Sequence, residues 1–478
     1  MLNKKLFKVN PHIKWRWETN DKILLSSFLI LNKTAGEILD LCNELCKNNE
    51  FCDVDAATEL IHERYQNVPK LELREDVEKI MEDFYEKDIF LRYNNGRWER
   101  KFEMDEHSSK DFLHFARFPF RNEVISKFKR KLKAPIVVVC ELTYNCNARC
   151  PHCYVSASRN RNRETELTTV EWKSVIDEAR KMGVFTVGFS GGEPLLRNDL
   201  ENLIKFAKSR EMIVYVWSNG LLLTKEKIKK LEDAGLDYIQ LPIDGLRETH
   251  DRFRGVNGLF DHVMDTINLL KKSKISTHVI ITLNKINMEE VPRLMKLLNK
   301  MGVVYGLNDF HVVGRGERNK HLQLTEEDYL KVLLKIQEKE EEWNMKLAYP
   351  RVPASFFKKI IEIKYLNHIE PYKCFAGILT CAITPSGDVK PCTLSYGVTA
   401  GSVKEKTLEE IWKSSKLLNA FREADNDFEG CTFCPLREKC SSGCKALPHQ
   451  INEDSTINCS GPKWRSCYEC MREAKSGV

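Results

Sequence analysis

The stretch Cys146-Asn-Ala-Arg-Cys150-Pro-His-Cys153-Tyr154 places three cysteines on one short segment of the chain. It follows an apolar run, residues 136–140, which is typical of a short buried strand. The cysteines are therefore predicted on the loop that leaves the C-terminal end of that strand, where active sites form in strand–helix barrels. Three thiolates can hold a four-iron cluster and leave its fourth iron open to another ligand. A structural zinc site and reduced thiols without a metal are the alternatives.

This spacing, followed by the aromatic Tyr154, resembles the radical S-adenosylmethionine (SAM) enzymes. In that family the open iron chelates the amino and carboxylate groups of SAM, and an electron from the cluster breaks the sulfonium bond. The resulting 5′-deoxyadenosyl radical removes a hydrogen atom from the substrate. The resemblance implies that Cys146, Cys150 and Cys153 are the catalytic cluster ligands and that Tyr154 belongs to the cofactor site.

Charge and hydropathy argue against nucleic acid and membrane as partners. The 478 residues carry a net charge of +6, with 75 Lys and Arg interspersed among 69 Asp and Glu. No apolar stretch follows Met1 as in a signal peptide, and no run approaches the ~20 apolar residues that span a bilayer. We therefore expect a cytoplasmic protein. Seventeen cysteines without an export signal indicate metal or redox chemistry rather than disulfides.

The first 93 residues are predicted to form a winged-helix-like α+β module in which short strands precede helices. With Leu31-Asn-Lys-Thr-Ala-Gly-Glu-Ile-Leu-Asp at the strand–helix junction, this order resembles the PqqD-like recognition element of ribosomally made, post-translationally modified peptides (RiPPs). Strands are expected at 13–17, 23–25 and 28–31. The helices are expected to begin with a capping box of Thr34 and Glu37, to cover Ala56–Tyr65, and to carry the stripe Val77, Ile80, Met81 and Phe84.

The resemblance implies that this module binds the leader of a precursor peptide as an added strand, at an edge formed by Phe28–Leu31. The apolar stripe of the third helix either walls the peptide groove or faces the module's own core. A winged-helix module for DNA, or for structure alone, is the alternative, but residues 75–86 are mostly acidic and offer no basic recognition helix. Cys42, Cys46 and Cys52 are interpreted as core residues. Residues 94–134 are predicted to be a linker.

Between residues 135 and 315, short apolar strands alternate with amphipathic helices, a pattern that demands a parallel sheet with right-handed crossovers. Six such units resemble the partial (β/α)6 barrel of the radical SAM core. A charged bridging segment, 316–373, is expected to follow. Strands are expected near 136–140, 185–190, 213–217, 238–243, 276–282 and 306–313, and helices from Thr168, Asp199, Thr224, Phe260 and Asn287.

Three further motifs fall at the predicted strand ends. The first is Ser190-Gly191-Gly192-Glu193-Pro, in which glycines permit close backbone approach and Glu193 can accept hydrogen bonds from an ammonium group. The resemblance implies that this loop holds the amino group of SAM. It also implies that Ser218-Asn219-Gly contacts the ribose, and that Arg254, downstream of Asp244, can pair with the SAM carboxylate. Plain turns are the alternative for the first two motifs.

Ten of the seventeen cysteines lie after residue 373 and mark a separate C-terminal unit, 374–478. Their spacing resembles the SPASM domain, which carries two auxiliary four-iron clusters, and zinc ribbons are the alternative. By analogy Cys374, Cys392 and Cys444, with Cys381 as a further candidate, hold one cluster. Cys431, Cys434, Cys440 and Cys459 hold the other, and Cys467 and Cys470 are surplus.

Together these resemblances imply a peptide maturase of the sactisynthase type. It would bind SAM and three [4Fe–4S] clusters, take electrons from a flavodoxin or ferredoxin, and install a crosslink in a ribosomal precursor peptide. A thioether from cysteine is the favoured bond. A sulfatase-maturing activity is disfavoured because Thr393, rather than an acidic residue, follows Cys392. The alternatives are a radical SAM enzyme of heme synthesis acting on a tetrapyrrole, and an iron–sulfur carrier or scaffold.

Overall fold

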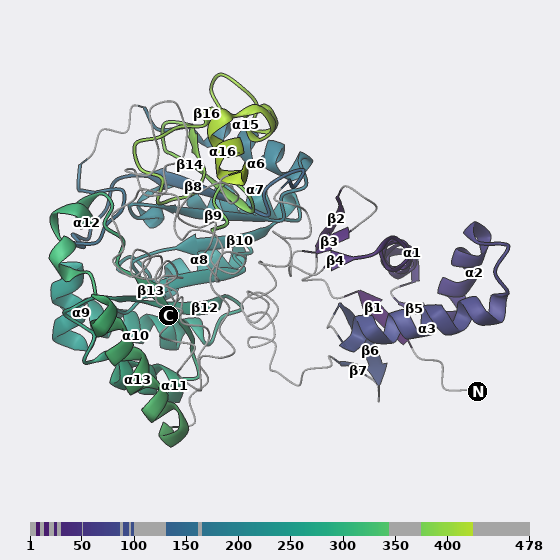
Figure 1. The fold of residues 1–478 in the computed structure, drawn as a ribbon, viewed down its shortest axis with the longest axis horizontal. Coiled ribbons are helices and arrows are strands. Elements are labelled where there is room, and N and C mark those ends of the chain that lie inside the picture. Colours follow the sequence, from purple (N-terminus) through teal and green to yellow (C-terminus); the bar gives the residue numbers. More distant parts are fainter. Residues whose placement is uncertain are drawn as a thin grey trace, which may run out of the picture. The chain divides into compact units, whose positions relative to one another are not determined.

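The computed structural model divides the chain into two compact units, Met1–Val124 and Ile125–Val478 (Figure 1). Most of the expected linker and the second half of the expected bridging segment lie outside the described residues. The structure describes residues 6–9, 14–18, 23–25, 30–49, 51–86, 89–94, 97–99, 131–160, 165–343 and 374–423.

The N-terminal unit contains the predicted strands and helices and a second sheet that the sequence pattern did not reveal. The predicted strands form an antiparallel sheet in the order β2-β3-β4, and the second sheet has the order β5-β1-β6-β7. Because β7 pairs with β6, this unit extends beyond the expected end at residue 93. The elements are β1 (Leu6–Val9), β2 (Trp15–Trp17), β3 (Ile23–Leu25), β4 (Ile30–Leu31), α1 (Lys33–Asn49), β5 (Cys52–Asp53), α2 (Val54–Arg64), α3 (Lys70–Glu86), β6 (Phe90–Asn94) and β7 (Arg97–Glu99).

The apolar stripe of α3 faces the unit's own core. Val77, Met81 and Phe84 are fully buried there, and Phe84 meets Phe90 edge-on with ring centroids 5.0 Å apart. The sequence allows this stripe to wall a peptide groove or to face the module's own core. Its buried residues fill the core, and Ile80 is only partly buried against it. Burial of such side chains is worth roughly 1.5–3 kcal/mol each.

Helix α1 begins differently from the expected capping box. The Asn32 side chain accepts a hydrogen bond from the Ala35 N–H at 2.9 Å, so the cap lies two residues earlier than Thr34. The Glu37 carboxylate instead accepts from the Tyr65 hydroxyl at 2.6 Å, which joins α1 to the end of α2. Asn is as good a helix cap as Thr. Because the Glu37 carboxylate is bound to Tyr65, it does not complete a capping box with Thr34, and Asn32 caps the helix instead.

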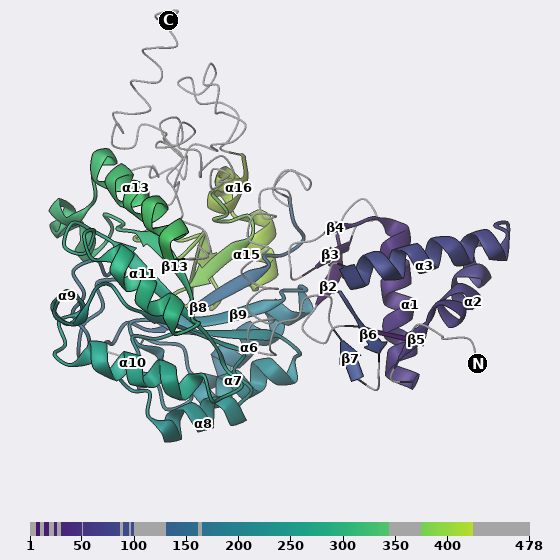
Figure 2. The ribbon, with the colours of Figure 1, turned by 90° about the horizontal axis from the view of Figure 1, so that it is seen from below.

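The second unit contains the predicted barrel. Its six parallel strands lie in sequence order, β8 to β13, and the strand–helix alternation confirms the expected α/β class. In Figure 2 helices α7, α8, α10, α11 and α13 follow one another around the outside of the strands. The strands are β8 (Val137–Thr143), β9 (Thr186–Gly191), β10 (Ile213–Trp217), β11 (Tyr238–Pro242), β12 (Ser276–Leu283) and β13 (Val304–Asp309). The helices are α6 (Thr169–Lys181), α7 (Leu200–Ser209), α8 (Lys225–Asp233), α9 (Arg247–Arg254), α10 (Leu259–Leu270), α11 (Val291–Lys300), α12 (Arg315–Arg318) and α13 (Glu326–Trp343), with 3-10 turns η3 (Pro194–Leu196) and η4 (Lys320–Leu322).

Local sequence signals explain most of these boundaries. Thr168 and Glu171 form the predicted capping box of α6, and the Thr224 side chain caps α8. The sixth strand ends at Asp309, earlier than expected. The fifth crossover helix starts at Val291 rather than Asn287, because the Asn287 amide donates to the carbonyls of Asp244 and Thr282 and holds a turn.

The C-terminal segment extends the barrel sheet beyond its first strand. β14 pairs parallel with β8, and β15 and β16 continue the sheet antiparallel. This places residues 380–383 beside the strand that precedes the three cysteines. The elements are β14 (Thr380–Ile383), β15 (Asp388–Lys390), β16 (Gly401–Ser402), α15 (Leu408–Ser414) and α16 (Lys416–Glu423).

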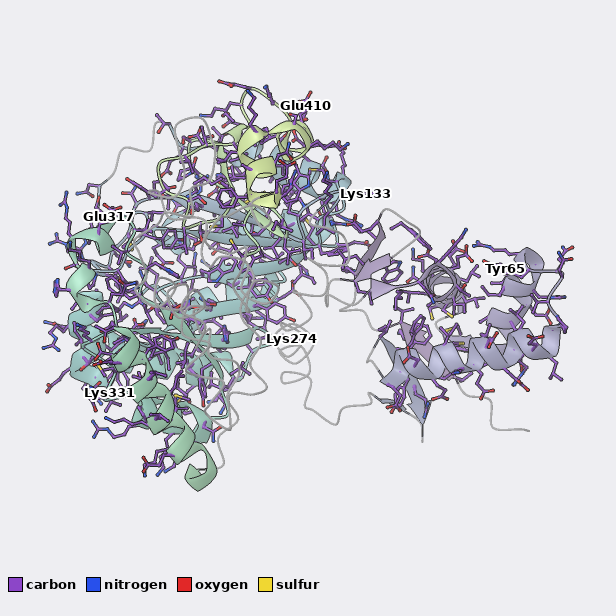
Figure 3. The ribbon with its side chains drawn as sticks, in the orientation of Figure 1. Tyr65, Lys133, Lys274, Glu317, Lys331 and Glu410 are labelled. Carbon is purple, nitrogen blue, oxygen red and sulfur yellow. The ribbon has the colours of Figure 1, made fainter. Side chains whose placement is uncertain are left out.

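Most charged side chains lie outside the core, as the exposed Lys274, Glu317, Lys331 and Glu410 show in Figure 3. A pair inside the second unit is an exception. The Lys390 Nζ of β15 lies 2.8 Å from Oε2 of Glu141 on β8, and their side chains are 4% and 0% exposed. The Tyr144 hydroxyl donates to the same oxygen at 2.6 Å. Removing one partner of an ion pair this deep is costly, because the other charge then stays buried without a counter-charge.

We expect Lys390→Met to lower the free energy of unfolding by about 3–5 kcal/mol, because Glu141 would stay buried without its cation. The double variant Glu141→Gln/Lys390→Met should recover part of this loss. Lys208→Met, which breaks the more exposed Lys208–Asp237 pair, is the control and should cost about 1 kcal/mol or less. Unfolding followed by circular dichroism measures all three. Equal losses for the two lysine variants would contradict this account.

Candidate active site

The three cysteines lie on a loop that is pinned at its base. Asn145 forms a bridge with Ser158, and the Cys146 N–H donates to the Ser158 carbonyl at 3.1 Å. Cys146 and Cys150 are buried and Cys153 is half-buried. The three cysteines thus lie on the loop after β8, as the sequence predicts. Main-chain contacts hold the two ends of this loop together.

Each of the three sulfurs accepts hydrogen bonds from the protein. The Ala148 N–H donates to Sγ of Cys146 at 3.5 Å, and the Ala157 N–H donates to Sγ of Cys153 at 3.2 Å. Sγ of Cys150 accepts from Nη1 of Arg254 at 3.5 Å. Such N–H groups stabilise thiolate more than thiol, so the surroundings suit sulfurs that ligate iron.

The two glycines after β9 allow main chain to pack on main chain. A Cβ atom on Gly191 would lie 2.2 Å from the Thr143 carbonyl oxygen, and one on Gly192 would lie 2.2 Å from the Asn145 carbonyl oxygen. The amides of Gly192 and Glu193 donate to those two oxygens at 2.6 and 2.9 Å. The close approach that the sequence predicts is therefore made to the start of the cysteine loop.

Glu193 is fully buried and joins the ends of two strands. Its carboxylate accepts from the Leu195 N–H at 3.1 Å, from the Ser218 hydroxyl at 2.9 Å and from the Asn219 N–H at 2.8 Å. Burial raises the pKa of Glu193 to about 7, against the lowering effect of these hydrogen bonds. Three donors leave room for about one more at a carboxylate.

The residues after β10 also contact the cysteine loop. The Asn219 amide donates to Oδ1 of Asn147 at 2.7 Å, and its nitrogen lies 3.8 Å from Sγ of Cys146. The Ser218 hydroxyl is used by Glu193. The structure thus brings the second and third predicted motifs together with the first.

The fourth predicted element, which contains Asp244 and Arg254, contacts the cysteine loop through Arg254. Nε and Nη2 of Arg254, the last residue of α9, lie 2.6 and 2.5 Å from Oδ2 of the buried Asp244. Oδ1 of Asp244 accepts from the Thr282 N–H at 2.7 Å. Although burial opposes it, the Arg254 guanidinium helps hold the pKa of Asp244 below its usual range. The Arg254 carbonyl accepts from the Arg149 N–H at 3.0 Å.

Tyr154 and Ser190 lie close together, with their hydroxyl oxygens 3.4 Å apart. Glu141 pairs in register with Ser190, so both side chains lie on the same face of the sheet. Oε2 of Glu141 is taken by Tyr144 and Lys390, whereas Oε1 is buried without a hydrogen-bond partner among the described residues. A spare buried acceptor here can receive a donor from a bound molecule.

The auxiliary cysteines are only partly described. Cys374 and Cys392 lie in one small buried cluster and interact electrostatically, and burial raises the pKa of Cys392 to about 11. Cys381 lies elsewhere. On β14 it pairs with Val138 and packs in the main core, where it interacts electrostatically with Cys140. Cys431, Cys434, Cys440, Cys444, Cys459, Cys467 and Cys470 lie outside the described residues.

Within the part of the chain that the structure describes, no three His, Cys, Asp or Glu side chains converge closely enough to hold a metal ion. A four-iron cluster binds each thiolate to a different iron, so its sulfurs need not meet at one point. Burial raises the pKa of the Cys146 thiol to about 11, and iron must displace that proton. The donor set fits a cluster: three thiols on one pinned loop, each with an N–H donor.

Sequence reasoning missed three residues of this site: Arg315, Gly314 and Glu141. Arg315 donates from Nη1 to the Cys150 carbonyl at 2.8 Å and also contacts the Ala157 carbonyl. A Cβ atom on Gly314 would lie 2.3 Å from the Tyr154 carbonyl oxygen. For Gly314 and Arg315, the available signal was an arginine with a glycine on each side, after the sixth strand. For Glu141, the available signal was a carboxylate within an apolar strand.

Comparison with known proteins agrees with this architecture. Family models match at residues 140–298 (Radical SAM superfamily), 374–441 (SPASM, iron-sulfur cluster-binding domain) and 24–89 (coenzyme PQQ synthesis protein D, PqqD). The AdoMet-dependent heme synthase of Methanosarcina barkeri is 31% identical over 332 residues, covering 67% of this chain and 94% of the relative. The chain belongs to the radical SAM superfamily. It is a radical SAM enzyme with an iron–sulfur SPASM domain and a PqqD domain.

Two further comparisons cover more of the chain. The PqqA peptide cyclase of Granulibacter bethesdensis is 28% identical over 353 residues, which cover 72% of this chain and 91% of the relative. The fold of Streptococcus suis SuiB, solved with its precursor peptide SuiA, matches with a TM-score of 0.65 at 16% identity and covers 95% of this chain and 98% of SuiB. No helix in the described ranges is long and apolar enough to cross a membrane.

Glu193→Gln is expected to weaken SAM binding by about tenfold or more without loss of iron, because it removes a charged acceptor worth roughly 1.5–3 kcal/mol. Ser218→Ala, which removes one neutral donor to the same carboxylate, is the control and should have a smaller effect. Equilibrium binding of SAM and iron content are the measurements. Unchanged SAM affinity in the Glu193 variant would remove this residue from the SAM site.

Proposed function

We propose that this protein is a peptide maturase that cleaves SAM reductively and uses the 5′-deoxyadenosyl radical to install a crosslink in a ribosomally made precursor peptide. Cys146, Cys150 and Cys153 would hold the cluster that binds SAM. The residues gathered around their loop would hold SAM itself: Tyr154, Ser190, Gly191, Gly192, Glu193, Ser218 and Asn219. Asp244 would support the cluster side of the site through Arg254.

The observation that most supports a peptide substrate is the separate N-terminal unit, which matches the PqqD family model. In the notation of Figure 1, β4 ends the three-stranded sheet, and the backbone groups of an edge strand can pair with an added peptide. Binding the leader there would raise the local concentration of the core peptide near the barrel. The names of the relatives, a PqqA peptide cyclase and a structure of SuiB with a precursor peptide, point to the same substrate class.

The favoured product is a thioether from a cysteine of the precursor. Closing such a bond after removal of a hydrogen atom releases one electron, and an auxiliary cluster near Cys374 and Cys392 is a suitable acceptor. Thr393, the residue after Cys392, has no carboxylate, which disfavours a sulfatase-maturing reaction. A flavodoxin or ferredoxin is the proposed source of electrons for SAM cleavage.

A tetrapyrrole substrate is the second candidate, because the heme synthase of M. barkeri is the relative with 31% identity and 94% coverage. That alignment covers 67% of this chain and leaves about a third of it unmatched. A tetrapyrrole substrate has no leader, so it gives no role to a leader-binding unit. Mass analysis distinguishes the two: a precursor peptide should lose two hydrogens on reaction, while a tetrapyrrole should remain unchanged.

We expect the anaerobically reconstituted protein to hold about twelve irons, the sum of three four-iron clusters. Joint replacement of Cys146, Cys150 and Cys153 by alanine should remove about four of them and abolish formation of 5′-deoxyadenosine. Replacement of Cys381 by alanine is the control and should leave iron content unchanged, since that thiol lies in the main core. Iron near four in the parent protein, with zinc besides, would contradict the two auxiliary clusters.

Removing residues 1–124 should abolish efficient modification of full-length precursor and leave uncoupled SAM cleavage largely intact. The cut follows Val124, the end of the N-terminal unit, whereas a cut near residue 96 would separate β7 from its partner β6. Precursor binding and the precursor's mass change are compared between the shortened and the full protein. A cluster-loaded shortened protein that binds and modifies precursor as well as the parent would refute leader binding by this unit.

A further inference from the structure

Exposed cationic side chains come from the cysteine loop and from the two segments that pack on it. Two of them belong to the loop, one lies on α9, and two lie on the turn that α12 and η4 form. They are Arg149, Arg159, Arg252, Arg318 and Lys320, and all are exposed. We call this group the loop patch.

Main-chain contacts bring the three segments together. The Arg149 N–H donates to the Arg254 carbonyl at 3.0 Å, and a Cβ atom on Gly255 would lie 3.2 Å from Cβ of Arg149, so the end of α9 packs on the loop. The Asn319 side chain, between the last two patch cations, donates to the Pro151 carbonyl at 3.2 Å. Figure 1 shows α9 and α12 on the same side of the second unit. The patch cations therefore belong to one neighbourhood of the surface.

Few acids counter this charge. Among the described residues, none of the five patch cations forms an ion pair with a carboxylate. Glu248 and Glu317 are the exposed acids on these segments. The Asp251 carboxylate accepts from the N–H groups of Gly258 and Phe260 at 2.6 and 2.8 Å. The patch thus keeps an excess of positive charge, which attracts an acidic surface.

The loop patch also lies beside the proposed cluster ligands. Arg149 is exposed and directly precedes Cys150, and Pro151, whose carbonyl Asn319 holds, directly follows it. Electron transfer weakens steeply as the protein between donor and acceptor thickens. A carrier protein therefore has to dock where a cluster ligand lies close to the surface, and the patch provides such a place.

We propose that the loop patch is the docking surface of a small acidic electron-carrier protein of the flavodoxin type, which delivers the electron for SAM cleavage. This inference rests on the proposed function and its ligand set Cys146, Cys150 and Cys153. The carrier loses one electron and the SAM-binding cluster gains it, so no covalent bond is made or broken in this step. Complementary charge speeds the encounter and orients the carrier toward the loop, and salt screens both effects.

The test compares reduced flavodoxin with dithionite as reductants of the holoenzyme, and it measures 5′-deoxyadenosine formed from SAM without peptide. The variant Arg252→Gln/Arg318→Gln/Lys320→Gln removes three patch cations and leaves the cysteine loop unchanged. Its apparent KM for flavodoxin should rise about tenfold at low ionic strength, within the range over which charge steering changes association. Its rate with dithionite should match the parent's, because a small reductant needs no docking surface. Added salt should raise the parent's KM toward that of the variant.

Lys272→Gln/Lys274→Gln/Lys331→Gln is the matched control, because it removes the same charge from exposed lysines elsewhere. Figure 3 shows Lys274 and Lys331 well apart from Glu317 of α12. The control should keep the parent's KM for flavodoxin. Glu317→Lys, which adds a cation to α12, should lower that KM.

The ratio of the flavodoxin-driven to the dithionite-driven rate, at a flavodoxin concentration well below the parent's KM, decides the proposal. Loss of clusters in a variant lowers both rates alike and leaves this ratio unchanged. A ratio at the parent's value in the patch variant, or an equal fall in the control, would overturn the proposal. A fall with reduced ferredoxin but not with flavodoxin would overturn it too. A parent protein that cleaves no SAM with either reductant would instead refute the proposed function.

Discussion

The structure around the cysteine loop depends on main-chain contacts that leave no space for a side chain. Gly191, Gly192 and Gly314 each approach a carbonyl oxygen of the segment from Thr143 to Tyr154 so closely that a Cβ atom would lie 2.2, 2.2 and 2.3 Å from it. Such contacts do not rely on flexible side chains, and they fix the loop from two sides. A cluster that must present one open iron in a defined direction benefits from a loop that is fixed before iron arrives.

Buried charge is the second constraint, and the chain meets it by giving each buried ion several partners. Glu193 accepts three hydrogen bonds, Asp244 is neutralised by Arg254, and Glu141 is neutralised by Lys390. These groups connect strands that are far apart in sequence, so they link the motifs after β9, β10 and β11 to the cysteine loop and to the C-terminal sheet extension. Oε1 of Glu141 is buried in this network without a hydrogen-bond partner among the described residues.

The barrel was predictable because strand and helix periodicities are local properties of the sequence, and the alternation between 135 and 315 forces a parallel sheet. The motifs at strand ends were predictable as neighbours for the same reason. The partners of Arg254 and Glu193 were not, because Cys150, Ser218 and Asn219 reach them only through the fold. Whether Cys381 joins Cys374 and Cys392 could not be predicted, because spacing cannot show which face of β14 a cysteine occupies. The short strands β1, β5, β6 and β7 have two to five residues each, too few for a clear period.

The central claim is that the radical formed at this site takes its hydrogen from a peptide, and isotope transfer tests it most directly. The full-length protein, loaded with clusters and SAM, is given a precursor peptide deuterated at carbon, and the 5′-deoxyadenosine is analysed by mass spectrometry. We predict one deuterium in the 5′-deoxyadenosine for each modified peptide. Unlabelled 5′-deoxyadenosine from that reaction, with deuterium transferred instead from a deuterated tetrapyrrole, would contradict the account and assign the enzyme to tetrapyrrole chemistry.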